Sequence, residues 1–130
     1  MSAIRVISQV LIARSGAWVF GRVYGWGAVP ITQASIQSMT MQVWDLDYMV
    51  PTYGPTVLTV SQVVYNSLQV TPQWLEAGGD QIGFNVLVVA PAVALSMAGR
   101  RMRCDVKFVP VTGENFVMQA EANLSPTYVP

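Results

Sequence analysis

The sequence predicts an all-β domain, a single antiparallel β-sandwich of about seven to nine short strands. Apolar residues recur at every second position in several segments, and Gly and Pro interrupt the chain at intervals of about ten residues. No long segment has the 3.6-residue period of a helix. The length of 130 residues suits one domain with a hydrophobic core. We expect this domain to span residues 1–124, followed by an extended tail over the two-proline segment 125–130.

The first half of the chain alternates predicted strands with connections. We expect strands over residues 3–14, 17–26 and 38–47. In the third of these, Met39, Met41 and Val43 alternate with polar residues, as in a strand with one buried face. Residues 48–56 contain two prolines and a glycine, so they are predicted to form a loop.

The middle of the chain contains a stretch that concentrates unusual residues, TPQWLEAGGDQIGFN over residues 71–85. Strands are predicted on both sides of it, over residues 57–64 and 82–89. Residues 73–77 can form one helical turn that the following glycines end. Because no histidine or second cysteine accompanies its two carboxylates, we interpret the stretch as a corner in which Trp74 plugs the end of the core. After Pro91, residues 92–99 are expected to be a short helix or loop.

The last two strands, over residues 100–109 and 115–124, have the cleanest alternation. One face of the first carries Met102, Cys104, Val106 and Phe108, and the opposite face carries charged residues. Thr112-Gly113-Glu114 suits a hairpin connection between them. Cys104 is therefore expected to point inward as a small core residue.

Charge is scarce in this chain and balanced in sign. Only 11% of the residues are charged while 52% are apolar, and the net charge is zero. Zero net charge argues against nucleic acid as a partner. The longest apolar run, residues 86–98, is too short for a membrane span and contains Pro91, so no membrane partner is expected. We interpret the missing charge as surface covered by other protein in an obligate assembly; the alternative is a small domain with an apolar surface.

The residues that usually perform catalysis are sparse. The chain has no histidine and one cysteine, which leaves no Ser/His or Cys/His pair, no disulfide and no zinc cluster. Asp45 and Asp47 share a strand face and could bind a cation, but two aspartates before a Pro-rich segment more often cap turns. We therefore expect no enzymatic activity, no metal and no cofactor.

Aromatic residues are crowded into one predicted strand. Their spacing by two places the large rings of each pair on one face, which suits either the sandwich core or the buried centre of a protein contact. A carbohydrate platform is a further alternative, although such platforms need polar partners. As candidate interface residues we name this aromatic set and one residue of the tail: Trp18, Phe20, Tyr24, Trp26 and Tyr128.

Residues 39–118 contain a recognisable series of segments: Met41 to Leu46, Leu58 to Gln69, Gln73-Trp74, Ile82 to Asn85 and Asp105 to Phe116. In these segments the chain resembles small structural proteins of tailed phages and prophages. The pattern has Gly, an aromatic, Asn and then Phe, whereas this chain has Gly83-Phe84-Asn85 followed by Val86. The resemblance implies a β-sandwich of the virion, assembled in the bacterial host cytoplasm and without enzymatic activity. A lone cysteine suits that reducing compartment.

The function most compatible with this resemblance is a capsid decoration (cement) protein with an immunoglobulin-like fold. Such a protein would oligomerise on the phage head, most simply as a trimer, and stabilise the major capsid protein. A first alternative is an adaptor module of the tail, neck or baseplate. A second, from another class, is a small carbohydrate- or ligand-binding module that uses Trp18, Trp26 or Trp74.

Overall fold

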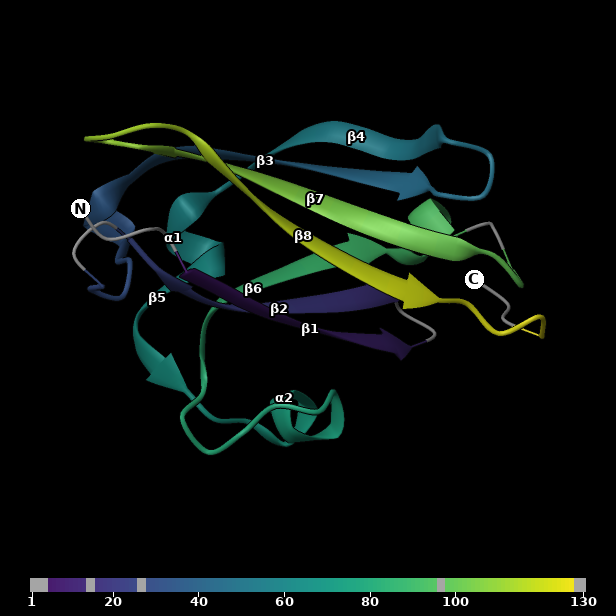
Figure 1. Ribbon diagram of the computed structural model, residues 1–130, viewed down its shortest axis with the longest axis horizontal. Coiled ribbons are helices and arrows are strands. Elements are labelled where there is room, and N and C mark those ends of the chain that lie inside the picture. Colours follow the sequence, from purple (N-terminus) through teal and green to yellow (C-terminus); the bar gives the residue numbers. More distant parts are fainter. Residues whose placement is uncertain (1–4, 14–15, 26–27, 96–97, 128–130) are drawn as a thin grey trace.

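The protein is a β-sandwich of two four-stranded antiparallel sheets packed face to face, as the sequence predicted (Figure 1). The computed structural model describes residues 5–13, 16–25, 28–95 and 98–127. None of the helices in these ranges has the length and apolar character needed to cross a membrane.

Sheet A and sheet B each contain four strands. In spatial order, sheet A consists of β1 (Arg5–Ala13), β2 (Gly16–Tyr24), β6 (Phe84–Pro91) and β5 (Val64–Gln69). Sheet B consists of β4 (Val50–Leu58), β3 (Ile36–Asp45), β7 (Arg101–Pro110) and β8 (Phe116–Asn123). The connections contain the short helices η1 (Gln33–Ser35), α1 (Val60–Val63), α2 (Pro72–Glu76) and η2 (Ala92–Leu95).

The strand order is that of an immunoglobulin domain. Taking β1 to β8 as strands A, B, C, C′, D, E, F and G, the two sheets read A-B-E-D and C′-C-F-G. Figure 1 also shows β1 running beside β8, where Ser8 Oγ donates a hydrogen bond of 3.3 Å to the Gln119 carbonyl. The immunoglobulin-like arrangement predicted from the sequence is therefore confirmed.

The main core fills the space between the sheets and follows the predicted alternation. The inward residues of β7 are fully buried: Met102, Cys104, Val106 and Phe108. They face Ala17, Val19, Val23, Val86, Val88 and Ala90 of sheet A. Burial, with a smaller contribution from Asp105, raises the pKa of the Cys104 thiol to about 12. Formation of the thiolate, the reactive form of cysteine, is therefore suppressed.

The segment between β3 and β5 departs from the sequence prediction. Residues 48–56 were expected to form a loop, but most of them belong to β4, the edge strand of sheet B. Two prolines are tolerated there because an edge strand leaves every second N–H without a ladder partner. Residues 57–64, expected to be one strand, contain the end of β4, helix α1 and the start of β5.

Asn85 replaces a stretch of backbone pairing between β6 and β2. Regular pairing of the two strands ends at Gly21 and Val86. Beyond it the Val23 N–H donates to Asn85 Oδ1 at 2.9 Å, and Asn85 Nδ2 donates to the carbonyls of Val23 and Ile31 at 3.0 and 3.3 Å. Asn85 is 1% exposed, so these bonds are made in the dry interior.

We expect Asn85→Leu to lower the free energy of unfolding by about 2–3 kcal/mol, because it leaves the buried Val23 N–H without a partner. Urea denaturation followed by fluorescence measures this loss. Asn123→Leu, at an exposed position of β8, is the control and should change stability by less than about 0.5 kcal/mol. Equal effects of the two substitutions would contradict the role assigned to Asn85.

Candidate functional site

The outer face of sheet A carries a second, smaller hydrophobic core. Phe20, Trp74 and Phe84 form its buried centre, and Leu11, Trp18, Tyr65, Ala77 and Leu87 pack around them. The Phe20 ring lies 4.9 Å from that of Phe84 and 5.9 Å from that of Trp74, both edge to face. Figure 1 shows the segment with α2 lying on the side of sheet A away from sheet B. Sheet A therefore packs against sheet B on one face and, around Phe20 and Phe84, against this loop on the other.

This second core accounts for part of the aromatic set of β2. Trp18 and Phe20 share a face, with their rings 6.3 Å apart. Phe20 has no exposed surface, so its ring packs the domain and cannot reach a partner. Trp18 is half-buried. Tyr24, also half-buried, lines a hollow of about 570 Å³ with Arg5 and Arg22. Trp26 and Tyr128 lie outside the described residues.

Trp74 occupies a different place from the one predicted. It was expected to plug the end of the main core, but it lies on the outer face of sheet A beneath its own loop. Its backbone N–H donates to Thr71 Oγ1 at 3.2 Å, and its indole N–H donates to the Asp80 carbonyl at 2.6 Å. A Cβ on Gly79 would come within 2.1 Å of the indole ring, so only glycine allows this close packing.

An ion pair fastens this loop to the sheet. Arg22, with a side chain only 6% exposed, donates to both carboxylate oxygens of Asp80, at 2.7 and 3.0 Å. Asp80 Oδ1 also accepts from the N–H groups of Ile82 and Gly83, at 3.0 and 3.2 Å. The Arg22 guanidinium, helped by these N–H groups, lowers the pKa of Asp80 to about 2. The stretch 71–85 is thus a corner, and the Asp80 carboxylate is fully engaged in holding it.

Asp45 and Asp47 organise the turn between β3 and β4. Asp45 Oδ1 accepts from the N–H of Asp47 at 3.0 Å and of Tyr48 at 3.3 Å, and its other oxygen lies 3.1 Å from Arg100 Nε. Asp47 accepts from the backbone N–H and Nε of Arg101, at 2.9 and 3.1 Å, and these contacts lower its pKa. Across the part of the chain that is described, no group of three or more His, Cys, Asp or Glu could hold a metal ion.

The same turn displays three consecutive apolar side chains, which we call the apolar tip: Tyr48, Met49 and Val50. They are 67%, 61% and 46% exposed. The Arg100 guanidinium lies 4.2 Å from the centre of the Tyr48 ring and steadies it. Met49 has a φ of +55°, a conformation that a side chain such as methionine rarely adopts. The sequence pattern predicted a loop over residues 48–56 and no role in binding, although these three apolar residues follow one another directly in the sequence.

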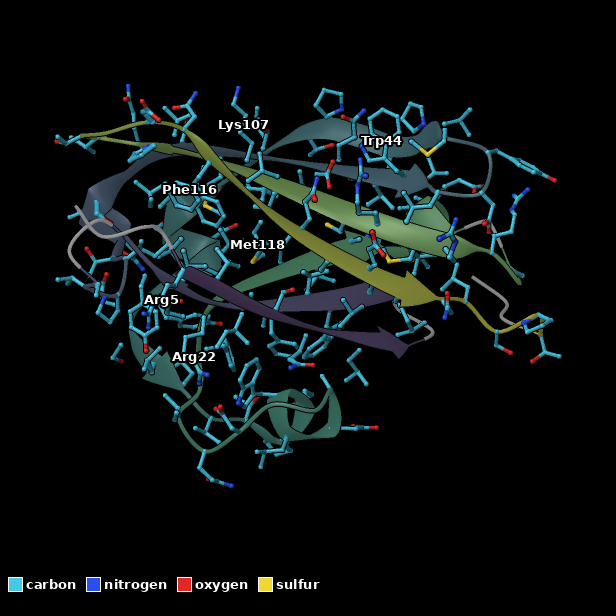
Figure 2. All side chains as sticks on the ribbon, in the orientation of Figure 1. Arg5, Arg22, Trp44, Lys107, Phe116 and Met118 are labelled. Atoms are coloured by element: carbon cyan, nitrogen blue, oxygen red, sulfur yellow. The ribbon has the colours of Figure 1, made fainter. Side chains whose placement is uncertain are left out.

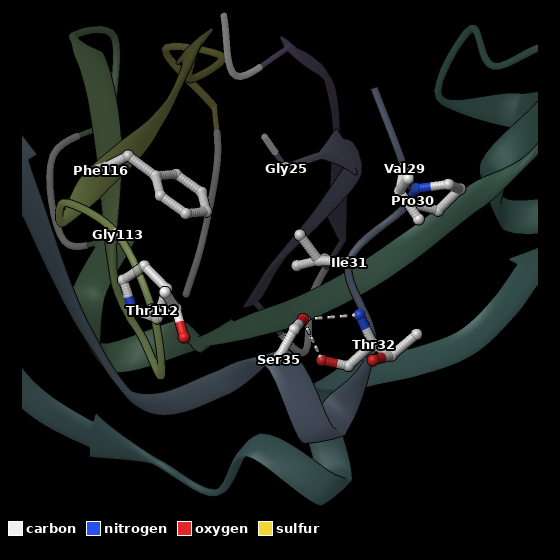
Figure 3. A pocket seen from close by; sticks show the side chains of 10 residues that line it. Gly25, Val29, Pro30, Ile31, Thr32, Ser35, Thr112, Gly113 and Phe116 are labelled. Atoms are coloured by element: carbon white, nitrogen blue, oxygen red, sulfur yellow. Dashed lines mark hydrogen bonds between the residues drawn. The ribbon is translucent and has the colours of Figure 1, made fainter. Parts of the chain in front are cut away.

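The opposite end of the sandwich contains a cleft of about 400 Å³, which we call the end cleft (Figure 3). Among the described residues, ten line it and all of them are uncharged: Gly25, Val29, Pro30, Ile31, Thr32, Ser35, Pro110, Thr112, Gly113 and Phe116. Ser35 Oγ donates to the Thr32 carbonyl at 2.8 Å and accepts from the Thr32 N–H at 2.9 Å. The Phe116 ring stacks on Phe108, with centroids 4.7 Å apart, and forms one wall. The chemistry available here is apolar contact.

Comparison with protein-family models, with curated proteins and with solved structures gave no match to this chain. The resemblance of residues 39–118 to phage structural proteins therefore stays a prediction from the sequence.

We expect Asp80→Asn to destabilise the protein at neutral pH and to have less effect in acid. The pKa of Asp80 falls from an ordinary value of about 4 to about 2 on folding, so its stabilising effect is complete above about pH 4 and is lost as the pH falls through about 2. Urea denaturation of both proteins from neutral pH down to about pH 2 should show the two stabilities converging.

The matched control is Glu121→Gln, at an exposed carboxylate of β8. It should leave the pH dependence of stability close to that of the wild type. A difference between Asp80→Asn and the wild type that stays constant over the whole pH range would contradict the role given to the Arg22–Asp80 pair.

Proposed function

We propose that this protein is a non-catalytic structural component of a phage particle, a capsid decoration (cement) protein that binds itself and the major capsid protein. The observation that carries the proposal is the distribution of charged and apolar groups on the surface.

Most of the acidic and basic side chains pair with one another within the domain. Four ion pairs join residues of the described chain: Arg22–Asp80, Arg100–Asp45, Arg101–Asp47 and Arg103–Asp105. The chain has only seven acidic and seven basic residues, so these pairs use more than half of each. What remains is a surface poor in free charge, which favours contact with protein over contact with nucleic acid.

Apolar side chains are exposed where a partner could cover them. The apolar tip and Val93 lie at one end of the sandwich, and Val29 and Val111 lie beside the end cleft at the other. Single exposed apolar residues are ordinary, but groups of them at the two ends of a rigid domain are typical of surfaces that bind protein. A cement protein needs such a scaffold and contact area, and no catalysis.

The alternatives predict different behaviour from the same scaffold. An adaptor of the tail, neck or baseplate would use the same kind of surface in far fewer copies per particle. A carbohydrate platform is less compatible with the geometry, because Trp74 is 1% exposed and Trp18 packs against the second core.

The test is to purify particles of the phage or prophage that encodes the chain. We expect the protein in these particles at a copy number comparable to that of the major capsid protein. Electron microscopy should place it on the outside of the head. A small copy number at the tail or neck would favour the adaptor, and absence from particles would reject both.

Deleting the gene should give heads that assemble but release DNA at a lower temperature, because the clamping contacts are lost. Adding the purified protein back should restore the release temperature, and adding Asp80→Asn at neutral pH, where the corner is weakened, should restore it less. Heads of equal heat resistance with and without the protein would contradict a cement role.

A further inference from the structure

The segment between β5 and β6, residues 70–83, is a closed loop on the outer face of sheet A, and we call it the strap. Its two ends are adjacent, because Gln69 pairs with Phe84 and a Cβ on Gly83 would come within 2.4 Å of the Gln69 carbonyl oxygen. The strap contains α2 and the buried Trp74. A surface loop whose ends meet can detach without moving the strands on either side of it.

The strap is hydrogen-bonded mainly within itself. The Trp74 indole N–H donates to the Asp80 carbonyl, and the Gly79 N–H donates to the Trp74 carbonyl at 2.8 Å. Apart from the strand pairing at its base, the hydrogen bonds that join the strap to the rest of the described chain all come from Arg22 of β2. Arg22 binds the Asp80 carboxylate and the Gly83 carbonyl, and Figure 2 shows it on the side of sheet A where the strap lies.

The second attachment of the strap is aromatic. The Trp74 ring lies 5.9 Å from that of Phe20 and 5.5 Å from that of Phe84. These three residues form a cluster separate from the main core, which lies on the opposite face of sheet A. Losing the contacts of the strap therefore leaves the contacts of the main core in place.

The base of the strap is held less firmly than the middle of the sandwich. The pairing of β5 with β6 is irregular between Val64–Val86 and Gln69–Phe84, whereas β3 and β7 pair continuously from Met39–Phe108 to Asp45–Met102. Segments held by few contacts open at a lower free energy than the core does. The helix α2 has five residues and is too short to persist once detached, so opening exposes its N–H groups to water.

We propose that the strap opens and closes as a unit on the folded sandwich, with the Arg22–Asp80 pair as its fastening, and that opening uncovers the rings of Phe20 and Phe84. Separating this pair exposes both charges to water, which costs less than breaking a pair whose members stay buried. The strap is thus a conformational device of the chain itself and does not depend on the proposed function.

The first test is hydrogen exchange of the wild type followed by NMR, with the Trp74 indole N–H as the probe. Trp74 is 1% exposed, so this N–H exchanges only when the strap opens or the whole domain unfolds. We expect its exchange, relative to the intrinsic rate, to be at least about 100-fold faster than that of the slowest amides of β3 and β7. Low concentrations of urea should affect it little, because opening the strap exposes a small surface.

The second test changes the core and the fastening separately. Val106→Ala leaves a cavity in the main core and should speed the exchange of the β3 and β7 amides about 10-fold or more. It should leave the Trp74 indole unchanged, because the closed and open forms contain the same altered core.

Asp80→Asn should instead speed exchange of the Trp74 indole about 10-fold, because it removes the charge that Arg22 binds. The matched control is Asp47→Asn, which weakens the pair with Arg101 on sheet B and should leave exchange at Trp74 unchanged.

The third test holds the strap open. Trp74→Ala removes its aromatic contact, and we expect circular dichroism to show that the sandwich stays folded. The dye ANS, which fluoresces on exposed apolar surface, should become brighter with this variant than with the wild type. Leu75→Ala is the control on the same helix; Leu75 is 41% exposed, and its loss should leave dye fluorescence unchanged.

Three outcomes would overturn the proposal. The first is a Trp74 indole that exchanges at the rate of the core amides and with the same dependence on urea. The second is a Val106→Ala variant that speeds exchange at Trp74 and in the core equally. The third is a Trp74→Ala variant that unfolds, or one that is folded and leaves the dye dark.

Discussion

The pairing of β3 with β7 is the constraint on which both ends of this molecule depend. The two strands pair in register from Met39–Phe108 to Asp45–Met102, with their inward residues buried in the main core. Because a slip of one residue would turn every one of those side chains toward solvent, burial fixes the register strongly. The same register places Arg101 beside Asp47 at one end, and the β7–β8 turn beside η1 at the other. The apolar tip and the end cleft are therefore consequences of how the core is packed.

Sheet A has large aromatic side chains on its outer face that must be covered. Its outer face carries Trp18 and Phe20, rings too large to leave in water at little cost, since burying an aromatic side chain contributes about 1.5–3 kcal/mol. The loop with α2 covers them and supplies Trp74, while the buried Arg22 holds the loop through Asp80. A half-buried charge pair of this kind is retained only when it is well hydrogen-bonded, as here, where the carboxylate also accepts two backbone N–H groups.

Sequence pattern alone was sufficient for the fold class and for the strands whose faces differ most in polarity. The alternation around Cys104 predicted β7 and its buried face, because one face of that strand meets the core and the other meets water. The sequence pattern failed to predict β4, because its two prolines are typical of a loop. They are tolerated in this strand only because it lies at the edge of the sheet. The pattern also placed Trp74 at the wrong face, since no local signal states which side of a sheet a loop will cover. The tip and cleft require the register between distant strands, which a single sequence does not contain.

The pairing of charged side chains and the exposure of apolar ones together determine the character of the surface. With four ion pairs made within the domain, little unpaired charge remains to repel another copy or to attract a charged partner, so shape and apolar contact are what this surface offers to a protein partner. An edge strand interrupted by Pro51 and Pro55 resists pairing with a second sheet, which removes one route of unspecific association through sheet B. The two ends differ in shape: at one end a turn exposes Met49, and at the other the loops leave the end cleft.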